Sequence, residues 1–325
     1  MKMMIEQKVD DFLNYLLSAD TSQKYLKNCY QYHHLEDAEK NSYENSYRFL
    51  YYLEHGQTFF KTGDKSDIVI KPILYFYGMV HLLKACLLTR RPNYPENTTM
   101  LAHGVSTRKR KKQQYSFLQD EVKVQHKGLF PYFSANLFGL EQFSYEKIDM
   151  NQLLATIPEL NNMFMQHRDK APLINIGNLN STKLFFTVSL FDSYHMTEKK
   201  FTTYITKHLP NVEEASSHGK QFILQLAKPL QASSKGPFYY HVREQAFYFP
   251  MNRHYFSTYH EVMSHYLLLY NLSMISRYET EWWGELTHML PTEDFPFIKQ
   301  FLSVTSVKVP FLLGYFLYNQ KEASG

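Results

Sequence analysis

Glycine and cysteine are scarce in this chain of 325 residues, which contains 12 glycines and two cysteines. Few glycines leave little material for tight phosphate-cradling loops and favour helices over all-β designs. The sequence contains no Gly-x-Gly-x-x-Gly, no Gly-x(4)-Gly-Lys-Ser/Thr and no Gly-x-Ser-x-Gly motif. These absences argue against Rossmann cofactors, P-loop nucleoside triphosphatases and α/β-hydrolases, and no cofactor is predicted.

The few cysteines also bear on the cellular compartment. Cys29 and Cys86 lie in apolar stretches outside any CxxC pair, so we expect buried, reduced thiols in a cytosolic protein. The N-terminal stretch is amphipathic and carries acidic residues within its first ten positions, unlike a signal peptide. The apolar run from Ile73 to Leu88 is interrupted by His81 and Lys84 and is short for a bilayer span. These features predict a cytoplasmic protein that does not cross a membrane.

A surplus of positive charge is also lacking outside one segment. The formal net charge is +4, and removal of the five consecutive cations from Arg108 to Lys112 leaves a net charge of −1. Nucleic-acid-binding proteins usually spread Lys and Arg over a whole face. The concentration of charge in one run therefore indicates a local anion site rather than a broad nucleic-acid footprint.

The pattern of apolar residues predicts an α+β fold that is mostly helical. Its N- and C-terminal helices are expected to pack together, with an antiparallel β insertion at about 172–250. The first region, 1–171, contains a central buried helix over 72–90 and a basic, irregular loop over 92–127. Residues 251–325 are expected to complete the helical core, with a helix break at Pro310.

Two apolar stripes at helical spacing are predicted to face the core near the N-terminus. The first consists of Val9, Phe12, Leu13, Leu16 and Leu17, and the second of Tyr47, Leu50, Tyr51 and Phe59.

Further cations and a histidine precede the basic run in the sequence. If the loop over 92–103 folds back, these groups would form a pocket able to neutralise several phosphates, since Arg offers bidentate forks and Lys point charges. A polyphosphorylated nucleotide or an acidic protein surface would fit such a pocket. The alternative is a solvated loop whose charges aid solubility. The predicted anion ligands are Lys84, Arg90, Arg91, His103, Arg108, Lys109, Arg110, Lys111 and Lys112.

Two motifs in the sequence bear on catalysis. In HEVMSH, residues 260–265, the second histidine follows at i+5 rather than i+4, so the zinc-protease geometry fails and no metal is predicted. An Arg-x(4–6)-His pattern, typical of HEPN ribonucleases, joins Arg48 to His55 and Arg253 to His260. Chance alone predicts about one such match in this composition, so Arg48 and His55 are equally well explained as surface residues of a helix. The sequence favours a non-catalytic protein and leaves enzymatic activity open.

An aromatic corner, RYETEWWG, occupies residues 277–284. One interpretation is a corner that closes the core, in which Arg277 bonds helix carbonyls. The other is an interface, because Trp and Arg dominate binding hot spots. Under the second interpretation Arg277, Trp282 and Trp283 would anchor a partner.

Three blocks of the sequence resemble the YaaC-like proteins of Gram-positive bacteria: KPILYFYGMVHLLKACLLTRRP (71–92), LAHGVS (101–106) and YLLLYNLSMISRYETEWW (266–283). The chain departs from the family pattern at Glu279, where a proline is expected. The resemblance implies a cytoplasmic protein whose relatives tend to be encoded beside IMP dehydrogenase, the enzyme that oxidises inosine monophosphate.

Together with the basic run, this resemblance gives the leading hypothesis. The protein would be a non-catalytic regulator that binds a phosphorylated purine nucleotide and contacts IMP dehydrogenase in guanine-nucleotide metabolism. The alternatives are a HEPN-like ribonuclease, which would bind nucleic acid, and a ligand-independent protein-interaction module. The sequence leaves both a monomer and a homo-oligomer open.

Overall fold

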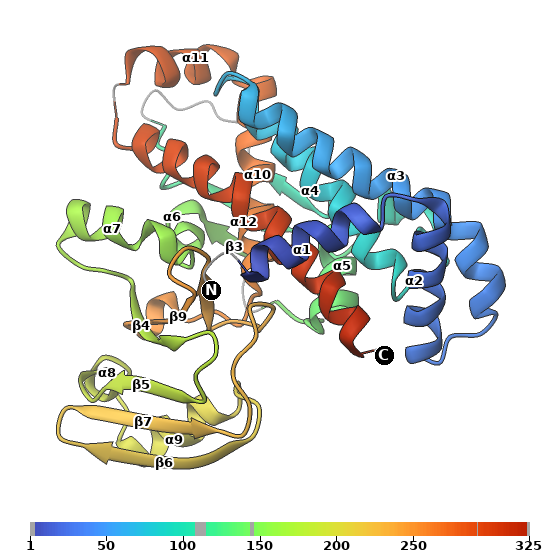
Figure 1. Ribbon diagram of the computed structural model, residues 1–325. Helices are drawn as coiled ribbons and strands as arrows, with labels where there is room; N and C mark the ends of the chain where they lie inside the picture. Colours follow the sequence, from blue (N-terminus) through green and yellow to red (C-terminus); the bar gives the residue numbers. More distant parts are fainter. Residues whose placement is uncertain (1–3, 108–114, 144–145, 291, 324–325) are drawn as a thin grey trace. The chain divides into compact units, whose positions relative to one another are not determined.

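The computed structural model of the protein describes residues 4–107, 115–143, 146–290 and 292–323 (Figure 1). The chain divides into two compact units, one made of residues 1–150 and 265–325 and the other of residues 151–264. Most of the secondary structure is helical, with small antiparallel sheets, and the C-terminal helix contacts the N-terminal one. The predicted α+β class is therefore confirmed.

The first unit is a helical assembly built around α4, which contacts α3, α5 and α12. Helix α4 is apolar nearly all round and begins with a proline in its first turn, where a missing N–H has no cost. It matches the predicted central buried helix. The helices of this unit are α1 (Met4–Tyr15), α2 (Ala19–Tyr32), α3 (Ala38–Lys65), α4 (Lys71–Leu88), the 3-10 helix η1 (Thr98–Leu101), α5 (Leu129–Phe138), most of α10 (Glu261–Tyr278), α11 (Thr280–Met289) and α12 (Asp294–Ala323).

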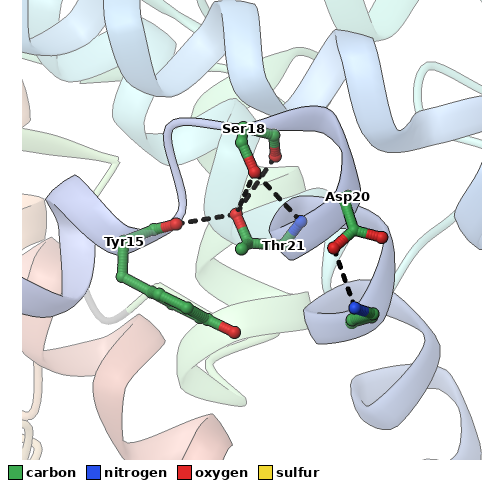
Figure 2. A network of polar contacts seen from close by, with 5 residues as sticks. Tyr15, Ser18, Asp20 and Thr21 are labelled. Carbon is green, nitrogen blue, oxygen red and sulfur yellow. Dashed lines mark hydrogen bonds and ion pairs between the residues drawn. The ribbon is translucent and has the colours of Figure 1, made fainter.

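The turn between α1 and α2 is fixed by short polar side chains (Figure 2). The Ser18 hydroxyl accepts a hydrogen bond from the Thr21 backbone N–H at 3.2 Å, which caps the start of α2. The Thr21 hydroxyl in turn donates to the Tyr15 carbonyl at 2.6 Å and so ties the two helices together. Asp20 lies in the first turn of α2, where its charge suits the helix dipole, and pairs with Lys24 at 2.8 Å.

The buried face of α3 differs from the predicted one. Phe49, Leu53 and Phe60 are buried, whereas Tyr47 and Tyr51 are exposed. The prediction of Tyr47 and Tyr51 as core residues is therefore wrong. The three buried residues fall on one side of the helix at spacings of four and seven, and this is the side that contacts α2 and α4.

Helix α12 continues through Pro310, so the predicted break is also wrong. Its neighbours Val309, Phe311, Leu312 and Leu313 are all buried, and their packing outweighs the lost backbone hydrogen bond. By length and composition the stretch Asp294–Gln320 could cross a membrane, with a mean hydropathy of 1.4. However, 72% of its most apolar window is buried inside the protein, as in the core helix of a globular domain.

A small sheet lies in the region that was predicted to be irregular. Strands β1 (Val105–Thr107), β2 (Glu121–Val124) and β3 (Lys147–Asp149) pair antiparallel in the order β1-β2-β3. Val122 and Ile148 face each other in register and are buried. Strands of three and four residues are too short to show a period of two clearly, which is why the sequence did not indicate them.

The second unit contains the β insertion, which the structure places at the predicted residues. Its elements are α6 (Met150–Leu154), η2 (Pro158–Leu160), α7 (Asn161–Arg168), β4 (Leu173–Asn178), β5 (Lys183–Thr187), α8 (Ser189–Ser193), α9 (Glu198–Thr206), β6 (Val212–His218), β7 (Gln221–Leu226), β8 (Tyr239–His241), β9 (Ala246–Pro250) and η3 (Arg253–Tyr255). They form two antiparallel sheets, β4-β9-β8 and β5-β7-β6. Phe186, Phe201, Phe222 and Phe249 form an aromatic core with ring centroids 5.4–6.2 Å apart.

Candidate functional site

Helix α4 carries its few polar side chains on one face. Tyr77, His81 and Lys84 recur at spacings of four and three in an otherwise apolar helix. Helix α3 packs against this helix and contributes aromatic rings beside the polar face. The His81 imidazole stacks on Phe59 at 5.6 Å and meets the edge of His55 at 5.4 Å. Among the described residues, the polar face of α4 is thus bordered by aromatic and imidazole rings.

Lys84 is the central charge of this face. Its ammonium lies 5.6 Å from the centroid of the Tyr52 ring, a cation–π contact, and its side chain is only partly exposed. Burial lowers the pKa of Lys84 from its ordinary value. Among the described residues no carboxylate forms an ion pair with it. A half-buried ammonium without a counterion is costly, because buried charges are normally paired.

His81 lies one turn away with an unused hydrogen-bonding atom. Its Nδ1 is buried and has no hydrogen-bond partner among the described residues. Burial first, and then the charges of Lys84 and His55, lower the pKa of His81 to about 4. At neutral pH the imidazole is therefore uncharged and can accept or donate one hydrogen bond to a ligand.

His103 follows η1 and lies over α4, at a point where the backbones of Gly104 and Gly128 approach each other closely. Gly104 has φ +78°, and a Cβ there would lie 2.6 Å from Pro131 Cδ, so only glycine fits. The Tyr266 hydroxyl donates to the His103 carbonyl at 2.9 Å. The imidazole packs against Phe76 at 5.0 Å. Burial, then the charges of Arg277 and Lys84, lower the pKa of His103.

Arg277 brings a second cation from the end of α10. Its Nε donates to the Ser273 carbonyl at 3.1 Å, and its Nη1 donates to the Tyr77 hydroxyl at 3.3 Å. The guanidinium also lies 6.0 Å from the Tyr77 ring centroid. These contacts fix the guanidinium beside the polar face of α4, and no described carboxylate forms an ion pair with it.

We call Tyr77, His81, Lys84, His103 and Arg277 the α4 cluster. The charged groups that depress the pKa values of its two histidines are cations or another histidine. An arrangement of fixed positive charges, neutral imidazoles and a phenol suits an anion, which would supply the missing negative charge. In the part of the chain that the structure describes, no three His, Cys, Asp or Glu side chains are grouped to hold a metal ion.

The structure brings together only some of the predicted anion ligands. Lys84 and His103 belong to the α4 cluster, whereas Arg90 and Arg91 have other partners. Arg90 Nη1 donates to the carbonyls of Asn136 and Leu137, at 3.1 and 3.3 Å, at the end of α5. There its charge suits the negative end of the helix dipole.

Arg91 pairs with Glu96 at 2.6 Å and donates to the Tyr132 hydroxyl at 3.1 Å. Arg90 and Arg91 line a cavity of about 410 Å³ together with acidic residues, so its charge is mixed. The cavity is lined by Leu35, Glu36, Asp37, Asn41, Arg90, Arg91, Pro92, Asn93 and Glu96.

The basic run itself, Arg108, Lys109, Arg110, Lys111 and Lys112, lies outside the described residues. Its described flanks are Thr107, at the end of β1, and Tyr115. The Tyr115 ring packs on Trp282 at 4.6 Å, and its hydroxyl donates to Asp120 at 2.7 Å.

The predicted catalytic pair lies on α3. Arg48 donates to the Asn45 side chain at 2.9 Å and to the Tyr94 carbonyl, so its guanidinium ties α3 to the loop after α4. His55 is exposed, and its ring meets His81. Two of the guanidinium nitrogens thus already make structural hydrogen bonds.

The two tryptophans have different environments. Trp283 is buried, and its indole N–H donates to the Val69 carbonyl at 2.9 Å. Trp282 remains partly exposed. Arg277 bonds a carbonyl of its own helix, as in the core-closing interpretation, but its charge contributes to the α4 cluster.

Sequence reasoning missed two features of the site. The role of His81 could have been found, because a histidine and a lysine three residues apart interrupt an apolar helix. The approach of Arg277 to His103 could not, since these residues are far apart in the sequence and meet only through packing.

A protein-family model described as YaaC-like Protein matches residues 14–317, nearly the whole chain. A search of curated proteins and a search of solved structures found no match to this chain. The chain belongs to the YaaC-like family.

Proposed function

We propose that this YaaC-like protein is a cytoplasmic, non-catalytic regulator that binds a phosphorylated purine nucleotide at the α4 cluster and contacts IMP dehydrogenase. The observation that carries the proposal is the Lys84 ammonium, half-buried and without a carboxylate partner among the described residues. Such a charge lowers the stability of the free protein, and a bound phosphate would remove that cost.

The surroundings of Lys84 support a ligand that combines negative charge with a flat ring. Arg277 supplies a second fixed cation, the Nδ1 of His81 has no hydrogen-bond partner among the described residues, and the charge of Lys84 also acts on the imidazole of His103. Tyr52 and Phe59 present aromatic rings on the α3 side, against which a base could stack. The five cations from Arg108 to Lys112 are predicted to contribute as well, and they would neutralise more of the negative charge of a polyphosphate. The IMP dehydrogenase contact depends on the family resemblance alone.

Isothermal titration calorimetry with IMP, GMP, GTP, ATP and inorganic phosphate tests the proposal. We expect a purine nucleotide to bind the wild type and not the Lys84→Met variant, which keeps the length of the side chain but removes its charge. Lys65→Met, at the exposed end of α3, is the matched control and should bind as the wild type does. The proposal is wrong if no nucleotide binds, or if Lys84→Met binds as tightly as Lys65→Met.

A second experiment separates the run Arg108 to Lys112 from the α4 cluster. In a variant with all five cations replaced by glutamate, the affinity for polyphosphates should fall more than the affinity for monophosphates. If this variant binds GMP and GTP as tightly as the wild type does, the site is confined to the α4 cluster.

The partner is tested by sedimentation of the protein with purified IMP dehydrogenase, with and without the nucleotide that binds. Linkage requires that a nucleotide which changes the affinity for the enzyme is itself bound with altered affinity in the complex. If the association with the enzyme does not depend on nucleotide and is weaker for the Trp282→Ala variant, the result would instead favour the interaction module. Cleavage of single-stranded RNA that stops on His55→Ala would favour the HEPN-like ribonuclease.

A further inference from the structure

The outer face of α3 presents three large aromatic side chains to solvent. Tyr43, Tyr47 and Tyr51 are 69%, 57% and 52% exposed, and they follow one another at spacings of four. The rings of Tyr47 and Tyr51 lie 6.2 Å apart. A single exposed tyrosine is common on protein surfaces. Three neighbouring exposed tyrosines on one helix are typical of a binding surface.

Two charges complete this row symmetrically. Lys40 precedes Tyr47 by seven residues and Glu54 follows it by seven, and both side chains are exposed. Within the described residues, neither has an ion-pair partner. With about 100° of rotation per residue, all five positions fall within an arc of about 80° on the helix. The face Lys40-Tyr43-Tyr47-Tyr51-Glu54, hereafter the tyrosine face, therefore reads the same in both directions apart from the sign of its end charges.

We propose that the tyrosine face binds a second copy of this chain, with the two α3 helices antiparallel and a two-fold axis through Tyr47. A two-fold interface brings residue i against residue j and residue j against residue i. About an axis at Tyr47, each Tyr43 meets the Tyr51 of the other copy. Each Lys40 likewise meets the other copy's Glu54, so both end charges are paired.

Charge placement selects this occupant over others. A parallel arrangement would bring Lys40 against Lys40 and Glu54 against Glu54, which is repulsive. The row also has no excess of one sign, so it offers no attraction to a strongly basic or acidic partner. Its five positions satisfy one another only when the second helix is the same and runs in the opposite direction.

The size of the face sets the strength of the expected dimer. From residue 40 to 54 the helix rises about 21 Å at 1.5 Å per residue. A pair of helices of this length buries less than the roughly 800 Å² per partner of a standard stable interface. We therefore expect a concentration-dependent dimer in exchange with monomer. The nucleotide proposal does not depend on this dimer.

Sedimentation velocity over a wide range of concentration, combined with charge exchange, tests the proposal. Lys40→Glu alone and Glu54→Lys alone each place like charges together twice across the axis. We expect each to raise the dissociation constant about tenfold, since exposed pairs contribute modestly. The double variant Lys40→Glu/Glu54→Lys restores opposite charges and should dimerise as the wild type does.

An equimolar mixture of the two single variants gives the most specific result. Each variant then meets a partner of opposite end charge, so a mixed dimer should form at concentrations where each variant alone is monomeric. A partner with any other axis or orientation would not produce this pattern. A mixture that stays monomeric while the wild type dimerises would place the interface elsewhere.

A covalent test locates the axis. Tyr47→Cys should form a symmetric disulfide-linked dimer under mild oxidation, because a residue on the two-fold axis meets its own copy. The native Cys29 and Cys86 are buried and do not interfere. Tyr278→Cys, at the end of α10, is the control: Tyr278 is 67% exposed, slightly more than Tyr47, and its cysteine variant should not cross-link. The proposal is wrong if the wild type remains monomeric at the highest concentration measured, or if Tyr47→Cys cross-links no better than Tyr278→Cys.

Discussion

Lys84 lies half-buried among aromatic rings, where burial opposes its charge and no described carboxylate balances it. Removing the charge should therefore stabilise the ligand-free protein. We expect Lys84→Met to raise the free energy of unfolding by about 1 kcal/mol, because an apolar side chain of similar volume costs less there. In a unit of this size that corresponds to a melting temperature about 2–4 °C higher. Differential scanning calorimetry without nucleotide measures it.

The sign of that effect separates function from structure. A lysine retained only for stability would lower the melting temperature when it is replaced. A residue that is retained for binding commonly lowers the stability of the protein, and replacing it then raises the stability. A lower melting temperature for Lys84→Met than for Lys65→Met would thus argue for a structural lysine.

His81 makes the helical unit sensitive to acid. Its pKa is about 4 in the folded protein, against an ordinary value of 6.5, because burial opposes the charged form. The unfolded chain therefore takes up a proton near pH 6.5, whereas the folded protein does not until about pH 4. The contribution of His81 to stability is complete above pH 6.5 and is lost as the pH falls through that window.

Urea unfolding at pH 7 and pH 4.5 tests this. The His81→Phe variant should lose less stability than the wild type between the two pH values, by about 1–2 kcal/mol. The same change at the exposed His126 serves as the control, and we expect it to leave the wild-type difference in place. Equal losses in the wild type and in His81→Phe would contradict the assignment.

At this scale the sequence pointed to two members of the candidate cluster, Lys84 and His103, but not to His81 as a ligand. Lys84 interrupts an apolar helix, and His103 is marked by the glycine that follows it. Arg90 and Arg91 look equivalent to Lys84 in sequence. Their partners, the end of α5 for one and Glu96 for the other, are set by tertiary packing that no local pattern encodes.

Among the elements, the start of α12 depends on one carboxylate. Asp294 is fully buried and accepts hydrogen bonds from the backbone N–H groups of Phe117 and Leu118 and from the Ser116 hydroxyl, each at 3.0 Å. We expect Asp294→Ala to lower the free energy of unfolding by about 2–4 kcal/mol, because two buried donors lose their acceptor. Asp294→Asn retains one acceptor oxygen and should lose less. Urea unfolding of the two variants orders them, and a smaller loss for Asp294→Ala would contradict this role.

Element positions were predictable where burial and periodicity agree, as for α4 and for the strands at 173–250. They were mispredicted where packing overrides a local rule. Pro310 does not end α12, because the apolar residues on both sides of it are buried. On α3 the sequence offers two stripes of large apolar side chains, and only the neighbouring helices decide which one is buried. The exposed stripe is the one that becomes the tyrosine face.

Over the whole molecule, two units with separate cores predict two unfolding transitions. Phe201 is fully buried in the second unit, with its ring 5.3 Å from Phe191 and 6.0 Å from Phe222. Phe201→Ala should cost that unit about 3–5 kcal/mol and lower its transition by roughly 10 °C or more. Phe49→Ala, in the core face of α3, should instead lower the transition of the helical unit.

The nucleotide connects this experiment to the proposed site. Because the α4 cluster belongs entirely to the helical unit, a bound nucleotide should raise that unit's transition alone. We expect the nucleotide-induced shift to survive in Phe201→Ala, whose second unit melts early. A single transition that moves as a whole with Phe201→Ala, Phe49→Ala and nucleotide alike would mean that the chain unfolds as one cooperative body.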